Sequence, residues 1–341
     1  MAKVNLLTIH YGKCYGAVMQ TYATCKLLER AGHSVTVINL VCPVSKSFRK
    51  YLSNIVDCAR EFQFWLFKKK YFAPLTNKAS NIRHIRLPKA DYTVVGSDQV
   101  WNRDITGIFG NTFFLDFVDK KQKKVALSSS FGKAIWNEPE DYTNEVKSLL
   151  SDFDAISVRE STGVKIIEDT FELTATNIQD PTLGYGQFND LVLNNKPLHQ
   201  IFPFLLSNNK QCKEKTLYIA KTLGIPLFKH SMFSNRFLKG PRHWLTYIKN
   251  SEYIITDSFH GLALSLIFNK QFFVFCANEN KFTRLKSLLQ LLSLEDRYVD
   301  SIEDFEARKE DLLKPIDYEL VNSILSKEQE KYDNFIKSAI G

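Results

Sequence analysis

The chain has 341 residues, 44% of them hydrophobic and 24% charged, with a formal net charge of +8. This composition is that of a folded globular protein and excludes a chain that is disordered throughout, and the length favours two domains. The positive charge is local, because residues 41–90 contain eleven Lys or Arg and only two acids. A basic surface over the whole fold is therefore not expected.

The sequence carries no sign of export or of a membrane span. The segment MAKVNLLTIH lacks the long apolar core and cleavage site of a signal peptide, and no window is apolar enough to span a bilayer. The six cysteines form no C-x-x-C pair and have no histidine at zinc-finger spacing. We therefore expect reduced thiols, a cytoplasmic protein and no metal site.

A βαβ unit opens the chain. An apolar strand at 4–9 precedes a polar, glycine-bearing loop at 10–16, a helix at 17–31 and a second strand at 35–40. Gly32 stands where helices commonly end in glycine. A strand, a helix and a strand within forty residues indicate a parallel sheet.

The α/β pattern returns after the basic stretch 41–90, for which we predict one or two helices and a loop. Three more strands are expected in the first half, at 92–95, 125–127 and 155–158. A linker at 184–197 then precedes a second set of elements. There the sequence predicts strands at 201–206, 226–228, 253–256 and 272–275, helices at 211–223, 241–250, 262–268 and 281–292, and a final amphipathic helix.

Ligands of open α/β sheets bind beyond the carboxyl ends of the strands, so polar residues at these ends form the candidate site. Gly16 belongs to the loop before the first helix, where glycine lets the backbone approach an anion, although a tight turn explains the same pattern. Ser97 and Asp98 follow the strand at 92–95. Asp98 suits contact with a sugar hydroxyl or the orientation of a base, or else a turn or helix cap.

Other strand ends carry hydroxyls and positive charge. Ser129 and Ser130 provide hydroxyls for a phosphate, or alternatively a capping loop. Arg159 offers a planar guanidinium that matches carboxylate or phosphate, the alternative being a surface pair with Glu160. Lys281 and Arg284 open a later helix, either as further anion ligands or as two solvated charges.

The segment Thr256-Asp257-Ser258-Phe259-His260-Gly261 is the most informative. It lies between an apolar strand and an apolar helix, so Ser258 is placed to cap that helix beside N–H groups that favour an anion. His260 falls in the first helical turn, where an imidazole next to an anion is a competent acid or base. Asp257 either holds the tautomer of this histidine or satisfies backbone amides.

Together these segments resemble the polysaccharide pyruvyl transferase family. The likeness rests on YGAVMQTYA, VGSDQVWN, SSSFG, ISVRE, QDPTLG and the segment containing TDSFHG, which follow in this order between residues 11 and 298. It implies an α/β fold of two Rossmann-like domains that face each other across a cleft, similar to GT-B glycosyltransferases. We expect an N-terminal domain at 1–183 on the acceptor side with the basic aromatic insertion 41–90, a C-terminal domain at 184–312 on the donor side, and a helix at 313–341 that packs back on the first domain.

The resemblance also implies a reaction. The pyruvyl group of phosphoenolpyruvate would move onto two hydroxyls of a sugar or lipid-linked oligosaccharide, forming a ketal without a metal or organic cofactor. The family's essential arginine falls on Arg159 and its essential histidine on His260, to which we assign acid–base catalysis, with Asp98 as a third catalytic candidate. The residues expected to bind substrate are Gly16, Ser97, Ser129, Ser130, Ser258, Lys281 and Arg284.

Other interpretations stay open. A GT-B glycosyltransferase that uses a nucleotide sugar would share the fold and a similar anion site. A protein that only binds nucleic acid or acidic glycan is the weaker alternative, because polar strand ends would then lack a purpose, and we expect no nucleic-acid partner. The aromatic, lysine-rich segment 62–72 suits peripheral contact with the inner face of the plasma membrane, or else a helix packed on the core with a solvated lysine tip.

Overall fold

The computed structural model describes residues 1–42, 54–207, 209–228, 239–276 and 279–341. The chain divides into two compact units: Met1–Arg49, Trp65–Tyr185 and Lys327–Gly341 form the first, and Lys50–Phe64 and Gly186–Ser326 form the second. Two helices, α2 (Asn54–Tyr71) and α13 (Tyr318–Ile340), contribute residues to both units. No helix in the described ranges combines the length and the hydropathy needed to cross a membrane.

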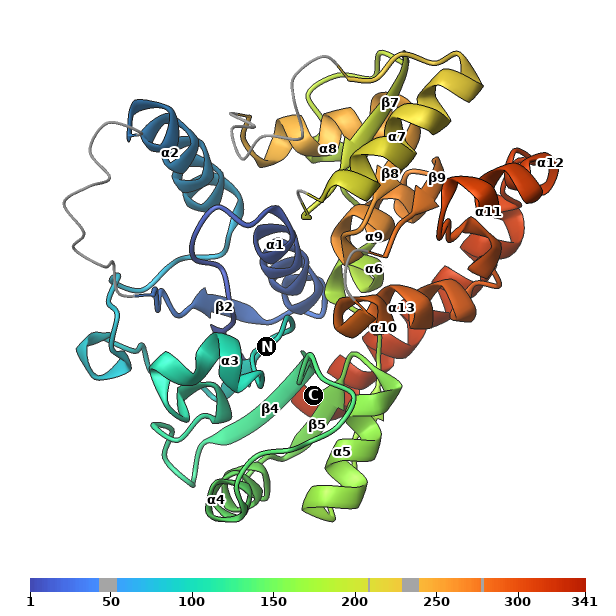
Figure 1. Ribbon diagram of the computed structural model, residues 1–341. Helices are drawn as coiled ribbons and strands as arrows, with labels where there is room; N and C mark the ends of the chain where they lie inside the picture. The colour runs from blue at the N-terminus through green and yellow to red at the C-terminus, as the bar shows by residue number, and fades with distance from the viewer. Residues whose placement is uncertain (43–53, 208, 229–238, 277–278) are drawn as a thin grey trace. The chain divides into compact units, whose positions relative to one another are not determined.

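The first unit contains a six-stranded parallel sheet (Figure 1). Its strands are β1 (Lys3–Leu7), β2 (Ser34–Val37), β3 (Tyr92–Val95), β4 (Lys123–Ser129), β5 (Ala155–Val158) and β6 (Thr176–Asn177). They are arranged in the order β2-β1-β3-β4-β5-β6. Because β1 has β2 on one side and β3 on the other, the direction of winding reverses between β1 and β3. Such a switch point opens a crevice at the carboxyl ends of the two strands, where ligands of this fold class bind.

The helices that flank this sheet are α1 (Tyr15–Arg30), α3 (Arg103–Thr106), α4 (Glu140–Leu150), α5 (Ser161–Phe171) and α6 (Pro181–Tyr185), with short 3₁₀ turns at Ile82–His84, Gly107–Phe109 and Thr112–Phe114. Helix α1 ends as predicted at glycine. Gly32 has a φ of +88°, its N–H donates to the Glu29 carbonyl, and the His33 N–H donates to the Leu28 carbonyl. This is the Schellman arrangement, which satisfies the last carbonyls of a helix.

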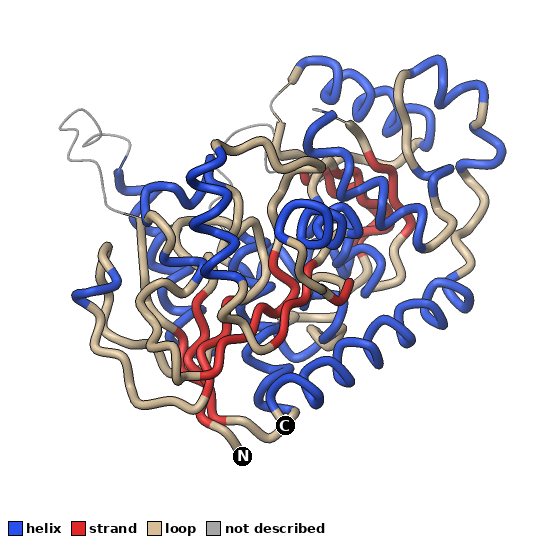
Figure 2. Tube along the Cα trace, turned by 90° about the horizontal axis from the view of Figure 1, so that it is seen from below, coloured by secondary structure: helices blue, strands red, loops and turns tan. Residues whose placement is uncertain are grey.

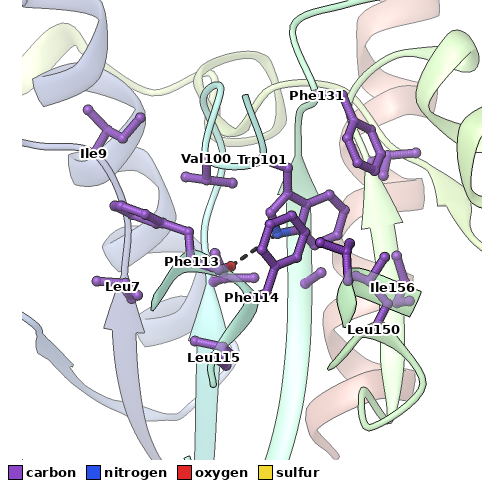
Figure 3. Close-up of a cluster of buried hydrophobic side chains, with 14 of the residues drawn as sticks. Leu7, Ile9, Val100, Trp101, Phe113, Phe114, Leu115, Phe131, Leu150 and Ile156 are labelled. Carbon is purple, nitrogen blue, oxygen red and sulfur yellow. Dashed lines mark hydrogen bonds between the residues drawn. The ribbon is translucent and has the colours of Figure 1, made fainter. Parts of the chain in front are cut away.

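Successive residues of the strands point to opposite faces of the sheet, so each face has its own apolar core. Leu7, Val95 and Ala126 lie on one face with Trp101, Phe113 and Phe131 (Figure 3). The Trp101 indole N–H donates to the Phe113 carbonyl at 3.0 Å, which fixes the loop after β3 on this core. The opposite face contains Leu6, Val94 and Val125 together with Tyr332, Phe335 and Ile336 of α13.

The second unit has a smaller parallel sheet of β7 (Leu198–Phe204), β8 (Ser251–Thr256) and β9 (Gln271–Val274). The segment 226–228, for which a strand is predicted, forms only a single bridge, between Leu227 and Ile201 on β7. A second bridge joins Tyr298 to β9. With both bridges included, the sheet has the order 2-1-3-4-5, which is that of the first five strands of the first unit, and its switch point lies between β7 and β8.

Helices surround this second sheet as well, as Figure 2 shows in blue around the red strands. They are α7 (Lys210–Leu223), α8 (Pro241–Asn250), α9 (Phe259–Ile267), α10 (Glu279–Leu291), α11 (Ile302–Ala307) and α12 (Lys309–Leu312), with 3₁₀ turns at Asn189–Leu191 and Glu295–Arg297. Ile201, Ile255 and Phe273 of the three strands pack with Cys212 and Ile219 of α7 in the core. The polar segment 256–261 therefore leaves a buried strand at the switch point of this unit.

Candidate functional site

In the first unit, the loops after β1 and β3 are held together at the switch point. The Thr8 hydroxyl donates to the Ser97 carbonyl at 2.8 Å and accepts from the Gln20 amide at 3.0 Å. A Cβ atom on Gly96 would lie 2.9 Å from Thr8 Cβ, so only glycine allows this approach of the two loops. The geometry places Ser97 and Asp98 at the edge where a ligand of this unit would bind.

Asp98 adopts a left-handed backbone conformation with a φ of +76°, which is uncommon for a residue other than glycine. Its carboxylate accepts from the Gln99 backbone N–H at 2.9 Å, and Asn102 caps the next helix, α3, instead of Asp98. The side chain is half-buried. The local hydrogen bond is that of a turn residue, and the φ value concentrates backbone strain at the switch point.

Three of the four serines predicted to bind substrate lie in the first unit, where their hydroxyls are buried and have partners within the fold. Ser97 donates to Asp180 at 3.2 Å, and Ser129 donates to the Gly96 carbonyl at 3.2 Å. Ser130 donates to Glu160 at 2.9 Å and accepts from the Gly132 N–H at 3.0 Å. In this state the hydroxyls therefore join neighbouring strand ends to one another.

Arg159 is the centre of this buried network. Its side chain is 1% exposed; Nε donates to Glu160 and Nη1 to Asp180, each at 2.9 Å. Burial by itself would lower the pKa of Arg159, but the Glu160, Asp180 and Asp98 carboxylates raise it above its ordinary value, so the guanidinium stays charged. The arginine is thus paired with carboxylates inside the unit, and not with Glu160 alone at the surface.

Gly16 lies inside helix α1 and not in the loop before it. Helix α1 begins at Tyr15, two residues before the predicted start, so Gly16 is buried in its first turn. His10, which follows β1, is fully buried, and its Nε2 lies 3.1 Å from the Ile38 carbonyl. A carbonyl only accepts, so Nε2 carries a proton. Burial lowers the pKa of His10 to about 4.

In the second unit, Asp257 links the two strands of the switch point. Its carboxylate accepts from the backbone N–H groups of Leu206 and Ser207, at 2.5 and 2.9 Å, and from the Ser207 hydroxyl at 2.5 Å. Of the two roles considered for Asp257, the structure therefore shows the satisfaction of backbone amides. The carboxylate fixes the loop after β7 against the loop after β8.

Ser258 caps α9 as predicted, since its hydroxyl accepts from the Gly261 N–H at 3.4 Å. The Thr256 hydroxyl accepts from the Ser258 N–H at 3.0 Å and donates to the Phe204 carbonyl at 2.7 Å. A Cβ atom on Gly261 would lie 2.3 Å from this hydroxyl, which explains why glycine follows His260. The motif thus lets the helix begin directly on the strand.

His260 occupies the first turn of α9, with 9% of its surface exposed. Its ring meets the Phe259 ring edge to face, with the centroids 5.4 Å apart. The first turn of α9 contains no acidic residue, and Asp257, which precedes the N-cap, accepts from the N–H groups of the loop after β7. An imidazole at the positive end of an apolar helix can exchange a proton with a bound anion.

The two basic residues predicted beside this site lie on α10, which contacts α9. Arg284 is half-buried. The backbone of Lys281 is helical, and its side chain lies outside the described part of the structure. Neither residue is placed against His260 by a described contact, and both remain predictions as substrate ligands.

The sequence did not indicate Asp180, the second acidic partner of Arg159. Asp180 is fully buried and accepts from Ser97, Arg159 and the Thr182 N–H. It belongs to the QDPTLG segment, one of the motifs that carry the family resemblance. The only feature of the sequence that could have pointed to Asp180 is its position directly before Pro181.

Comparison with known proteins finds one matching family and solved structures with a similar fold. The model for polysaccharide pyruvyl transferase matches residues 15–280. The structure of S. aureus MnaA with UDP is 13% identical, covers 100% of this chain and 97% of its own, and superposes with a TM-score of 0.53. Arabidopsis thaliana UGT89C1 with quercetin is 7% identical, covers 98% of each chain, and gives a TM-score of 0.51. These likenesses show an α/β fold of two Rossmann-like units of the GT-B type, and no curated protein sequence matches the chain.

Proposed function

Because the chain belongs to the polysaccharide pyruvyl transferase family, we propose that it moves the pyruvyl group of phosphoenolpyruvate onto two hydroxyls of a sugar. The product would be a pyruvate ketal on a surface or extracellular polysaccharide precursor. All six cysteines are free thiols, which supports a reaction in the cytoplasm. No metal or organic cofactor takes part in the proposed reaction.

The observation that carries this proposal is the position of His260 at the start of α9. The switch point between β7 and β8 is where an α/β unit binds its ligand, and the capped, apolar helix presents N–H groups and an imidazole there. Phosphoenolpyruvate has a carboxylate and a phosphate, both of which suit the N-terminus of a helix. Lys281 and Arg284, on the neighbouring helix, are the proposed additional anion ligands.

The proposed chemistry balances without an external reactant. His260 in its protonated form gives a proton to the methylene carbon of phosphoenolpyruvate, which becomes a methyl group and makes C2 electrophilic. The first sugar hydroxyl attacks C2 and returns its proton to His260. The second hydroxyl then attacks C2 as the C2–O bond to phosphate breaks, and its proton leaves with the phosphate. Acid–base catalysis of this kind contributes about 10² to 10⁴ in rate.

For Arg159 we propose a positioning role that the sequence alone did not suggest. Nε and Nη1 of Arg159 donate to the carboxylates of Glu160 and Asp180, so these three side chains together carry a net negative charge. Such a cluster is better suited to bind substrate hydroxyls than to bind an anion. Through Asp180 and Glu160 it orders Ser97 and Ser130 at the edge of the first sheet. This edge, with Asp98, is the proposed acceptor side.

The test is the identity of the leaving group. Purified full-length protein is incubated with a sugar acceptor and either phosphoenolpyruvate or a set of UDP-sugars, and the release of inorganic phosphate and of UDP is followed. The proposal predicts acceptor-dependent phosphate release from phosphoenolpyruvate. Release of UDP with no phosphate release would instead show a glycosyltransferase that uses a nucleotide sugar, the alternative that shares this fold.

A further inference from the structure

Helix α2 has three large apolar side chains that are exposed to solvent. The exposed fractions of Phe62, Trp65 and Leu66 are 57%, 49% and 44%. Residues three and four apart lie on the same side of a helix, so these three side chains and Lys69 form one face. We call this set, Phe62, Trp65, Leu66 and Lys69, the exposed face of α2.

The exposed face is additional to the side of α2 that packs on the protein. Phe64 and Phe67 are 1% and 3% exposed, and the Phe67 ring meets the Tyr22 ring of α1 edge to face, with centroids 6.2 Å apart. Phe64 and Phe67 therefore form the packed side of α2. Packing on the core, the alternative role considered for segment 62–72, accounts for Phe64 and Phe67 but leaves the exposed face unexplained.

The charges that follow the exposed face along α2 are all positive, whereas the exposed Glu61 directly precedes Phe62. Between Phe62 and Tyr71 the helix carries three lysines and no acid. Lys69 and Lys70 are exposed, and the Lys69 ammonium lies 5.1 Å from the centroid of the Trp65 ring. Tryptophan, phenylalanine and leucine edged by lysine are the side chains of a helix that lies in a membrane interface, with rings at the headgroup level and lysines towards phosphate.

We propose that the exposed face of α2 binds the surface of a membrane that contains anionic lipids. A second copy of this chain with its α2 parallel to this one would bring the lysines together. Nucleic acid is also less suited, since Leu66 has no ring on which a base stacks. The membrane contact itself is independent of the reaction; its purpose, to reach an acceptor on a lipid carrier, rests on the proposed function.

The experiment uses full-length protein and vesicles of phosphatidylcholine with or without phosphatidylglycerol. Trp65 is a built-in probe, because Trp101 and Trp244 are 2% and 0% exposed and Trp136 is half-buried. We expect co-sedimentation with the anionic vesicles and a blue shift of tryptophan emission. Trp65→Phe should keep binding and lose the shift, while Phe62→Ser/Trp65→Ser/Leu66→Ser should not sediment. Each lysine near an anionic surface contributes about a factor of five, so Lys69→Gln/Lys70→Gln should bind about 25-fold more weakly.

The matched control is Ile135→Ser, which removes an apolar side chain that is 74% exposed elsewhere in the chain and should sediment like the wild type. The proposal is overturned if wild type ignores both kinds of vesicle, if the triple variant binds as wild type does, or if an oligonucleotide binds the face and displaces the vesicles. Measuring phosphate release with a soluble acceptor distinguishes a failure of the proposed membrane contact from a failure of the proposed reaction. Loss of vesicle binding with normal release leaves the reaction intact, and vesicle binding without any release removes only the proposed reaction.

Discussion

The guanidinium of Arg159 and the carboxylate of Asp180 form an ion pair that is sealed from solvent, with Nη1 and Oδ2 2.9 Å apart and side chains 1% and 0% exposed. The two residues are separated by 21 positions and come from the end of β5 and the start of α6. Asp180 also accepts from Ser97 after β3. One ion pair therefore fixes three separate segments at the carboxyl edge of the first sheet.

Loss of one member of this pair should destabilise the first unit strongly. Arg159→Ala leaves Glu160 and Asp180 as buried charges, and breaking a buried pair in this way costs about 3 to 5 kcal/mol. Thermal unfolding of Arg159→Ala, Asp180→Ala and the double variant measures the interaction free energy between the two side chains. We expect the double variant to lose less than the two single losses together. Additive losses would contradict the pairing, and Lys314→Ala, in an exposed pair with Asp311, is the control that should change little.

The buried His10 should make the protein less stable in mild acid. Its folded pKa is about 4, below the ordinary value of 6.5, because burial disfavours the charged ring. Between these pH values the unfolded chain binds a proton that the folded chain does not, so stability falls as the pH drops from 6.5 to 4. The full effect is about 3 kcal/mol.

The measurement is the pH dependence of urea unfolding for the wild type and His10→Gln, whose amide keeps a donor for the Ile38 carbonyl. Lys68, whose positive charge also lowers the pKa of His10, is present in both proteins. We expect the wild type to show the steeper loss below pH 6.5. Parallel curves for the two proteins would contradict a neutral, buried imidazole.

The close contact at Gly261 predicts a sharp effect of one methyl group. In Gly261→Ala the added Cβ would meet the Thr256 hydroxyl at 2.3 Å, and overpacking of this kind costs about 1 to 3 kcal/mol. We expect a lower melting temperature and a loss of turnover, because the first turn of α9 must move. Gly107→Ala, where the nearest atom would lie 3.3 Å away, is the control. Equal melting temperatures for the two variants would show that α9 does not depend on this contact.

The catalytic assignment of His260 predicts a loss of rate without a loss of fold. His260→Ala should release phosphate from phosphoenolpyruvate about 10² to 10⁴ times more slowly than wild type. Its circular dichroism should be unchanged. His199→Ala removes a histidine whose side chain is 68% exposed and should keep full activity. Normal turnover by His260→Ala would remove this residue from the mechanism.

Much of the fold follows from local patterns in the sequence. The strands at 92–95 and 155–158 have the predicted limits, and helix α7 ends at Leu223 before Gly224 as predicted. These elements combine a clear apolar pattern with a clear stop signal. Leu227 forms only a bridge, because a short apolar run does not determine how many residues pair with a neighbouring strand.

The candidate site was less predictable than the fold. Ser258 as a helix cap could be read from its place before an apolar helix, since capping depends on residues close in sequence. The pairing of Arg159 with Asp180 could not be read in this way, because Asp180 approaches Arg159 only when β4, β5 and β6 are assembled in order. The two equivalent switch points also depend on strand order, which periodicity does not reveal.

The binding of phosphoenolpyruvate tests the central claim most directly, because it needs no knowledge of the acceptor. A ligand that binds only the folded protein stabilises it by about 2.7 kcal/mol at one hundred times its Kd. The melting temperature of the full-length protein is measured with phosphoenolpyruvate, with UDP and with inorganic phosphate at equal concentration. We predict that phosphoenolpyruvate raises it well above the value with phosphate and that UDP does not. A rise with UDP, and none with phosphoenolpyruvate beyond that of phosphate, would contradict the account.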